Sequence, residues 1–306
     1  MPKLLLVANP SASGFTGGVF RDVLAILGKE YHVDPVWPLH PGETRALASV
    51  AARDGYDAVV AMGGDGVVHH VANGLVGTSA ALGIVPAGTT NVLARILGIP
   101  GKARKAAQAL ATSTPVPTAL LEVTADDTEI EYVTFALGIG FDADVVEIAE
   151  RRPHSKARLG GIHYAQTAIG RLLAAWRNRH ADLRVDCDGD RLDALAVLVQ
   201  VHGPYTYFGR VPLHITGSDG GLAAMAAEDL EVHRSTELFT RAVLRRRIPE
   251  RLGVRVWTDF DRLTIEADPP ARYQADGELL GRAHHLAVNP LPDAIAVLRD
   301  PNRSQP

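Results

Sequence analysis

Apolar and polar residues alternate in two ways along the first third of the chain. Short, continuous apolar runs have the length and character of strands buried on both faces. Between them lie longer segments whose apolar residues recur at helical spacing, as Phe20, Val23, Leu24 and Leu27 do. The predicted strands are residues 3–8, 32–37, 58–62 and 82–85, and the predicted helices are residues 17–27, 44–53, 91–97, 102–111 and a segment that ends near residue 75. This alternation predicts an α/β domain with a parallel sheet.

The pattern changes after the segment Thr112–Pro117, which is rich in proline and hydroxyl side chains. Beyond it, short strand patterns are separated by clusters of Gly, Pro, Asp and Ser, which favours a β-sandwich-like second domain. Two helical patterns interrupt the strands, near residues 159–179 and 235–246. The predicted strands are residues 119–123, 129–137, 183–187, 192–201, 211–216, 222–227, 254–258 and 263–267.

Composition narrows the function classes. The chain has 306 residues, 46% of them hydrophobic, with 31 basic and 35 acidic side chains and a net charge of −4. This balance argues against a general nucleic-acid binder. The apolar run at residues 4–8 is too short for a signal peptide, and no apolar run approaches the ~20 residues that span a bilayer. The lone Cys187 excludes an internal disulfide. We expect a cytoplasmic protein.

A glycine-rich turn, Gly63-Gly64-Asp65-Gly66, follows the third predicted strand. Glycines let the backbone approach a ligand closely, and the following helix directs its N-terminal N–H groups at the same place. An aspartate beside phosphate is unfavourable unless it binds Mg²⁺ or takes a proton from a substrate, and both are roles in kinases. The alternative is a simple turn in which Asp65 caps the helix.

Two further polar loops follow the first and fourth predicted strands. In the loop of residues 86–91, Gly88 permits close backbone approach, while Thr89, Thr90 and Asn91 offer hydroxyl and amide groups. The loop after the first strand is Asn9-Pro10-Ser11-Ala12-Ser13-Gly14. Helix capping is the alternative for each loop. Because three such loops follow strands of one sheet, they predict a nucleotide phosphate site at its carboxyl edge.

Other nucleotide motifs are not supported. The chain has no G-x-x-x-x-G-K-[ST] and no H-R-D or D-F-G set, so it is neither a P-loop protein nor of protein-kinase type. Residues 138–143 match G-x-G-x-x-A but lie mid-chain, and we interpret them as a tight turn that packs a helix on a strand. Residues 274–278, Gln-Ala-Asp-Gly-Glu, predict an Asp-Gly hairpin turn.

Together these motifs resemble the diacylglycerol kinase catalytic family, which includes bacterial lipid kinases and sphingosine kinases. The resemblance covers nearly the whole chain, and five modest motifs in the same order make it specific. They lie at residues 9–14, 63–66 with 73–75, 86–91 with 94–95 and 97–100, 138–143, and 276–278.

The resemblance implies a fold of two domains. Residues 1–117 would form an α/β nucleotide-binding domain of the phosphofructokinase and NAD-kinase kind. Residues 118–290 would form a β-sandwich domain for the lipid acceptor, and residues 291–306 would return to the first domain. The strand-like residues 294–298 suit that return.

The resemblance also implies the site residues. ATP would bind between the domains, with its phosphates over Gly64, Asp65 and Gly66. Glu278 or Asp276 would act as base on a lipid hydroxyl, and Asp65 would position Mg²⁺·ATP. The implied metal ligands are Asp65 and Asp219. The implied nucleotide-binding residues are Asn9, Ser11, Ser13, Gly14, Gly63, Gly64, Asp65, Gly66, Gly88, Thr89 and Asn91.

Several positions depart from the family pattern. Val67 replaces a threonine, His70 stands where the family often has a glutamate, and Ser218 reduces the loop that would hold a structural Mg²⁺ with Asp219. These departures leave two alternatives to a lipid kinase open. One is an NAD-kinase-like enzyme, and the other is a nucleotide- or lipid-binding protein with weakened catalysis.

The implied partners are a lipid alcohol and the surface of a membrane. A basic stretch within residues 151–179, interleaved with apolar residues, and the cluster Arg245-Arg246-Arg247 suit a peripheral contact with anionic lipid. The alternative is a solvated face on an ordinary packed helix. No nucleic acid is expected as a partner, and a homodimer is compatible with the sequence.

Overall fold

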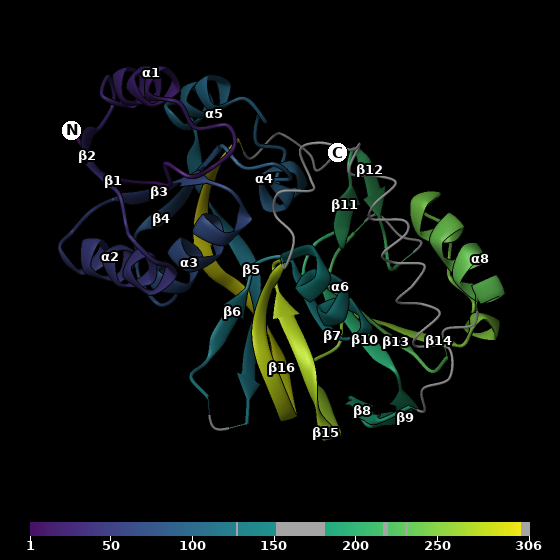
Figure 1. Cartoon of the computed structure of the whole chain (residues 1–306). Coiled ribbons are helices and arrows are strands. Elements are labelled where there is room, and N and C mark those ends of the chain that lie inside the picture. Colours follow the sequence, from purple (N-terminus) through teal and green to yellow (C-terminus); the bar gives the residue numbers. More distant parts are fainter. Residues whose placement is uncertain (127, 151–180, 217–219, 230–231, 301–306) are drawn as a thin grey trace. The chain divides into compact units, whose positions relative to one another are not determined.

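A computed structural model describes residues 1–126, 128–150, 181–216, 220–229 and 232–300 (Figure 1). The chain divides into two compact units. Unit 1 comprises Met1–Leu120 and Leu291–Pro306, and unit 2 comprises Leu121–Pro290. The two division points fall within long strands, β5 (Thr114–Ala125) and β16 (Glu278–Arg299). The chain therefore passes from one unit to the other twice, each time within a strand.

Unit 1 is built on a parallel sheet with the strand order β2-β1-β3-β4, and the end of β16 pairs in parallel with β4 through Val297 and Leu82. The residues of β3 and β4 are buried throughout, as strands covered on both faces must be. These strands are β1 (Lys3–Ala8), β2 (His32–Val36), β3 (Ala58–Gly63) and β4 (Ala81–Pro86).

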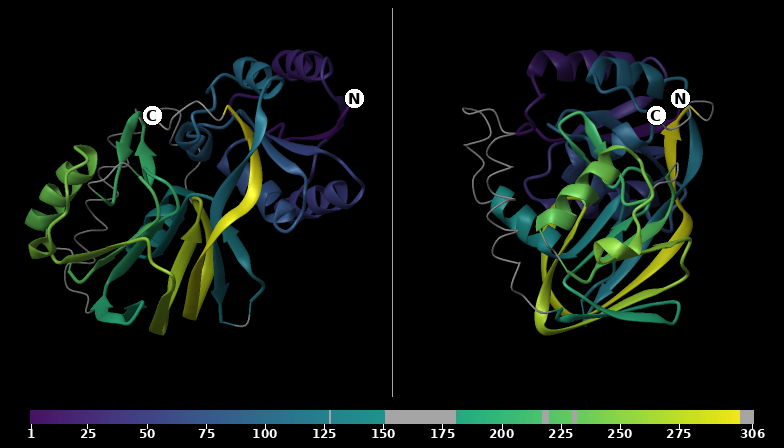
Figure 2. Two further views of the ribbon diagram at one scale, coloured as in Figure 1. Left: turned by 180° about the vertical axis from the view of Figure 1, so that it is seen from behind. Right: turned by 90° about the vertical axis from the view of Figure 1, so that its right-hand side faces the viewer.

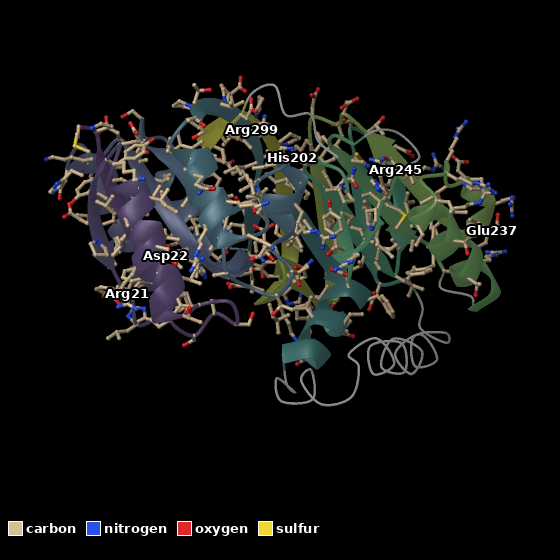
Figure 3. All side chains as sticks on the ribbon, turned by 90° about the horizontal axis from the view of Figure 1, so that it is seen from above. Arg21, Asp22, His202, Glu237, Arg245 and Arg299 are labelled. Atoms are coloured by element: carbon tan, nitrogen blue, oxygen red, sulfur yellow. The ribbon has the colours of Figure 1, made fainter. Side chains whose placement is uncertain are left out.

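Helices cover both faces of this sheet. Helices α1 (Gly17–Leu27) and α5 (Ala103–Leu110) lie on one face, and α2 (Pro41–Arg53) and α3 (Asp65–Leu75) lie on the other (Figures 1 and 2). The short helix α4 (Val92–Ile96) follows β4. Buried apolar side chains of β1 and β3 pack against Val23 and Leu27 of α1. Asp22, labelled in Figure 3, pairs with Arg104 of α5 and joins the two helices at their surface.

Unit 2 is rich in strands. Its main sheet has the order β14-β13-β10-β7-β15-β16 with antiparallel pairs, β8 and β9 extend from β15, and β5 and β6 extend from β16. Helix α6 (Phe141–Glu150) follows β7, and helix α8 (Val232–Val243) packs near the separate hairpin of β11 and β12. The strands are β6 (Glu131–Val133), β7 (Ala136–Gly140), β8 (Leu183–Cys187), β9 (Asp190–Ala194), β10 (Ala196–Gln200), β11 (Thr206–Phe208), β12 (Val211–Leu213), β13 (Ala223–Ala227), β14 (Val254–Thr258) and β15 (Leu263–Ala275).

The structure confirms the predicted fold class in its main features: an α/β domain with a parallel sheet is followed, where a β-sandwich-like domain was predicted, by a strand-rich region. Two predicted strands were wrong in detail, because a break after Val133 divides residues 129–137 between β6 and β7, and a break at Leu195 divides residues 192–201 between β9 and β10. The sequence did not predict β11 or the full length of β16. The helix predicted near residues 159–179 lies outside the described residues. None of the helices in the described part of the chain is long and apolar enough to cross a bilayer.

Candidate active site

Three loops begin at the same edge of the sheet in unit 1. Ala8 is in register with Met62, and Gly63 is in register with Pro86. The loops that follow β1, β3 and β4 therefore leave the sheet at its carboxyl edge, which is where ligands bind in open α/β sheets. The structure brings together the three segments that carry the nucleotide-binding residues predicted from the sequence.

The loops after β3 and β4 are in close backbone contact. A Cβ atom added to Gly88 would lie 2.5 Å from the Cα of Gly64, so only glycine fits at this position. The amide of Asn91 uses both of its polar atoms on the same loop: Oδ1 accepts from Gly88 N at 3.0 Å, and Nδ2 donates to Gly88 O at 2.8 Å. Asn91 therefore shapes the loop around Gly88.

The loop after β1 is joined to the loop after β4. Gly14 N donates to Ala87 O at 2.7 Å, and the hydroxyl oxygens of Ser13 and Thr89 lie 3.3 Å apart. Asn9 Oδ1 accepts from Ser11 N at 2.9 Å, which is an Asx turn within the loop. Two hydroxyl groups from different loops thus lie side by side, while Asn9 holds the backbone that presents one of them.

The N-terminus of α3 lies in the glycine turn after β3. Gly64 is the N-cap and no side chain caps the helix, so the interpretation of Asp65 as the capping residue was wrong. The first-turn N–H groups of a helix have no carbonyl partner within the helix and carry partial positive charge. Asp65 is the first helical residue and is part-buried, and its Oδ1 accepts from Leu93 N at a long 3.4 Å.

In unit 2, the two candidate bases lie on the hairpin between β15 and β16. Ala275 is in register with Glu278, so Asp276 and Gly277 form a two-residue turn. Their φ angles of 52° and 87° are those of the turn type that favours Asp-Gly, which confirms the predicted hairpin.

Asp276 is anchored inside unit 2. Its side chain is 3% exposed. Its Oδ2 accepts from Thr134 N at 2.8 Å and from Thr134 Oγ1 at 2.9 Å, and its Oδ1 accepts from Phe135 N at 2.8 Å and Ala136 N at 3.1 Å. These bonds also explain why the predicted strand 129–137 breaks, since the backbone N–H groups between β6 and β7 bond to a side chain instead of a strand.

Glu278 differs from Asp276 in its surroundings. It is the first residue of β16 and retains part of its surface exposure. The oxygens of Asp276 accept from backbone and hydroxyl donors, whereas the side chain of Glu278 is partly exposed.

A buried polar network supports this turn, and the sequence did not predict it. Gln274 Oε1 accepts from Gly277 N at 2.8 Å, and Gln274 Nε2 donates to Asp142 Oδ2 at 2.7 Å. Tyr205 donates its hydroxyl to the same Asp142 oxygen at 2.7 Å. The network therefore runs from the start of α6 to the turn that precedes Glu278.

Burial has the largest effect on the pKa values of Asp142 and Tyr205 in this network. It raises the pKa of Asp142, while the hydrogen bonds from Tyr205 and Gln274 oppose that rise. Burial and the charge of Asp142 raise the pKa of Tyr205 well above its ordinary value. A Cβ atom at Gly138 would overlap the Asp142 carboxylate, so the first glycine of the G-I-G-F-D segment makes room for it. In the sequence, the glycine four residues before Asp142 was the available signal that the Asp142 carboxylate packs against this strand.

Some predicted residues lie outside the described part of the chain. Asp219, predicted as a metal ligand, and Ser218 fall in residues 217–219, and the basic stretch falls largely in residues 151–180. Of the two predicted metal ligands, the structure therefore describes Asp65 alone.

Comparison with known proteins addresses the first part of the chain. Residues 3–123, which include all three loops, match the family model of the diacylglycerol kinase catalytic domain. This part of the chain is therefore similar to that catalytic domain. The matched segment contains β1 to β4, the glycine turn and the N-terminus of α3.

Curated relatives extend the similarity. A diacylglycerol kinase of Mycobacterium tuberculosis is 37% identical over 140 residues, which cover 45% of this chain and 42% of that protein. An uncharacterized protein of Synechocystis, sll0036, is 29% identical over 253 residues, covering 80% of this chain and 55% of that protein. The chain spans about half the length of the curated relatives it matches.

A solved structure shows that the fold is shared over the whole chain. A crystal structure of a diacylglycerol kinase from Bacillus anthracis superposes with a TM-score of 0.72 and 17% sequence identity, covering 98% of this chain and 97% of that one. At this identity the similarity establishes the fold of the diacylglycerol kinase catalytic domain and of the strand-rich region that follows it.

Proposed function

We propose that this protein is an ATP-dependent lipid kinase that transfers the γ-phosphate of Mg²⁺·ATP to the hydroxyl of diacylglycerol or a similar lipid alcohol. The observation that carries the proposal is the convergence of three loops of a diacylglycerol kinase catalytic domain on the open N-terminus of α3. A diacylglycerol kinase among the curated relatives supports the acceptor class.

The proposal assigns the nucleotide to unit 1. The backbone N–H groups at the start of α3 would bind phosphate oxygens, because the helix terminus supplies both donors and partial positive charge. The adjacent hydroxyls of Ser13 and Thr89 would add donors. The Asp65 carboxylate suits the Mg²⁺ that accompanies ATP, since Mg²⁺ in such sites takes one or two carboxylates besides phosphate oxygens and water. When bound, Mg²⁺ neutralises charge on the phosphates.

The proposal assigns the proton transfer to Glu278 of unit 2. As the lipid hydroxyl oxygen forms its bond to the γ-phosphorus, its proton passes to the Glu278 carboxylate, and the bond from the γ-phosphorus to the oxygen that bridges to the β-phosphate breaks. ADP then leaves with that oxygen. Asp276 and Gln274 touch none of the reacting atoms in this scheme, and they hold the turn that carries Glu278.

Phosphate transfer from labelled Mg²⁺·ATP would test the proposal. The purified chain is assayed with diacylglycerol, other lipid alcohols and a sphingoid base in mixed micelles, and with NAD⁺ in a separate reaction. A labelled lipid is the expected product and would define the acceptor class. Label on NAD⁺ would instead show an NAD-kinase-like enzyme, and ATP binding without transfer would show a binding protein.

A matched pair of variants tests the base. Glu278→Gln removes the proton acceptor and should lower kcat by about 10³-fold, within the range of general base catalysis. Glu266→Gln is the control, because Glu266 is an exposed glutamate of the adjacent strand β15. Equal activity of the Glu278→Gln variant and the unaltered protein would remove Glu278 from the mechanism.

A further inference from the structure

We propose that unit 2 carries a docking surface for an anionic lipid bilayer at helix α8. The α8 face consists of Val211, Phe239, Leu244, Arg245, Arg246 and Arg247. These residues come from strand β12, helix α8 and the segment directly after α8.

The first observation is the exposure of large apolar side chains. Phe239 is 50% exposed, Leu244 is 52% exposed and Val211 is 40% exposed. Among the described residues of unit 2, Ile130 is the other large apolar residue exposed to this extent. Apolar side chains gathered on a surface indicate a site of interaction with a protein or a membrane.

Phe239 lies on the exposed side of α8, and Leu244 follows the end of the helix. Thr236, Phe239 and Thr240 are exposed and follow helical spacing, and Leu244 continues the turn because its N–H donates to Thr240 O at 3.0 Å. Thr236, Phe239 and Thr240 present methyl, phenyl and hydroxyl groups at this surface.

The hairpin of β11 and β12 belongs to the same surface. Strand β12 packs against α8, and His214 N donates to Ala242 O at 3.1 Å just beyond the end of β12. Figures 1 and 2 show α8 at an edge of unit 2, away from β15 and β16. Val211 is thus an exposed apolar residue on the strand that packs against α8.

The second observation is the charge at the end of α8. Arg245, Arg246 and Arg247 are exposed and form no ion pair with any residue that the structure describes. Arg245, labelled in Figure 3, has a φ of 52°, a conformation that favours glycine, and it follows the end of the helix.

The one acidic residue of α8 is neutralised. Glu237 accepts from Arg241 at 2.8 Å and also pairs with Arg251, and these two guanidinium groups lower the pKa of its carboxyl. The arginines at the end of α8 therefore retain an excess of positive charge at the surface.

An anionic bilayer fits both observations. Basic residues next to a membrane interact with anionic headgroups, while neighbouring apolar side chains enter the boundary between headgroups and acyl chains. A nucleic acid would engage the arginines but offers little to Leu244 and Val211. A membrane contact would also hold the protein where a lipid substrate resides, although the surface itself does not depend on kinase activity.

Vesicle sedimentation with the full chain tests the charge. Vesicles of phosphatidylcholine alone are compared with vesicles that also contain phosphatidylglycerol, without nucleotide. The triple variant Arg245→Gly, Arg246→Gln, Arg247→Gln should bind the anionic vesicles about 100-fold more weakly. Glycine suits the positive φ of residue 245, so the variant should fold. The control variant, Arg184→Gln with Arg191→Gln and Arg262→Gln, removes the same charge from β8, β9 and the residue directly before β15, and it should retain most of the binding.

A second variant tests the apolar side chains. Phe239→Gln with Leu244→Gln should weaken binding to anionic vesicles about tenfold and leave the sedimentation coefficient of the protein unchanged. The proposal is overturned if the unaltered protein does not prefer anionic vesicles, or if the control variant loses as much binding as the arginine variant. It is also overturned if the apolar variant converts a dimer to a monomer, because the surface would then bind a second copy of the chain. Since binding is measured without ATP, a negative result here is distinct from failure of the lipid kinase proposal.

Discussion

Each unit contains an Asp-Gly turn that resembles the other in sequence and differs in its environment. Asp65-Gly66 opens helix α3 in unit 1, where Asp65 is part-buried and its Oδ1 accepts from Leu93 N at 3.4 Å. Asp276-Gly277 closes the β15–β16 hairpin in unit 2, where Asp276 is 3% exposed and accepts four hydrogen bonds of 2.8 to 3.1 Å. The same dipeptide thus occupies two very different sites.

The difference shows what decides whether a carboxylate can take part in chemistry. A carboxylate that accepts several backbone N–H groups stabilises the fold, because its charge satisfies donors that would otherwise be buried without partners. A carboxylate at an open helix terminus, beside loops that converge on it, keeps the capacity to bind a cation. We therefore expect substitutions at the two aspartates to separate activity from stability.

The largest effect is expected for Asp65→Asn on activity. The amide cannot supply the negative charge that Mg²⁺·ATP requires, so kcat/KM should fall by about 10³-fold. The temperature of unfolding should change little, since the side chain is not a buried anchor. Initial rates of lipid phosphorylation and a thermal melt measure both.

Asp34→Asn is the matched control for that variant. Asp34 lies on β2 of the same unit and accepts from the hydroxyl of Tyr56, and an asparagine can still accept there. An active Asp65→Asn protein, or a loss of activity in the Asp34→Asn control, would contradict the assignment of Asp65 to activity and of Asp276 to stability.

Asp276→Asn should act on stability. An asparagine can accept at one oxygen, so its amide would face the N–H groups of Phe135 and Ala136 or of Thr134. We expect a loss of about 3 kcal/mol in the free energy of unfolding, or about 100-fold in the folding equilibrium. Urea unfolding followed by circular dichroism measures it. A free energy of unfolding within error of the unaltered protein would show that these bonds are not the anchor.

Sequence patterns predicted the strands, helix and loops around Asp65 better than the hydrogen-bond network around Asp276. The strand β1 and the helix α1 of unit 1 have the predicted bounds, because continuous apolar runs and helical spacing are local signals. The loops after β1, β3 and β4 could be grouped because parallel strands bring their carboxyl ends to one edge. The grouping of these loops at one edge therefore followed from the order of the strands along the chain.

The network around the second turn depends on contacts far apart in sequence. Asp276 bonds to residues 134–136, and Gln274 bonds to Asp142, which no local pattern specifies. For the same reason the break between β6 and β7 was missed, since the acceptor that interrupts the strand comes from a distant hairpin. Asp142 was assigned to a tight turn, and its buried charge was not foreseen.

Gln274→Met should give a smaller effect on catalysis. Methionine fills the space but neither accepts from Gly277 N nor donates to Asp142, so the turn before Glu278 loses a constraint. We expect kcat to fall about tenfold with KM for ATP unchanged, because the loops proposed to bind ATP are in unit 1. Steady-state kinetics with varied ATP measures this split.

Gln200→Met provides the control for stability. Gln200 is fully buried in β10 of the same unit and donates to Gly221 O at 2.9 Å. A general weakening of unit 2 would lower the activity of both variants, whereas a role in holding the turn would lower kcat in Gln274→Met alone.

The pH dependence of stability should reveal the buried carboxyl beneath the second turn. Burial raises the pKa of Asp142 in the folded state above its ordinary value of 3.8. Its contribution to stability is therefore complete below pH 3.8 and is lost as pH rises through the folded pKa. Asp142→Asn removes this titration, so its stability relative to the unaltered protein should improve with rising pH across that interval, by about 1.4 kcal/mol for each unit by which the pKa is raised. Urea unfolding of both proteins over a pH series measures the difference, and parallel curves would contradict a raised pKa.

The smallest effect is expected for Asp65→Asn on the local unfolding of unit 2. The rate at which a reagent labels the single cysteine, Cys187, measures that unfolding. Cys187 is 2% exposed on β8 and faces Leu263 of β15, and burial together with three nearby aspartates raises its pKa to about 12. The thiol should therefore react with a maleimide or a disulfide reagent only when unit 2 opens. Asp65→Asn should leave the rate of labelling within about twofold, whereas Asp276→Asn should accelerate it in proportion to its loss of stability. Equal acceleration by both variants would mean that the two turns stabilise one cooperative unit, and the separation of activity from stability between them would fail.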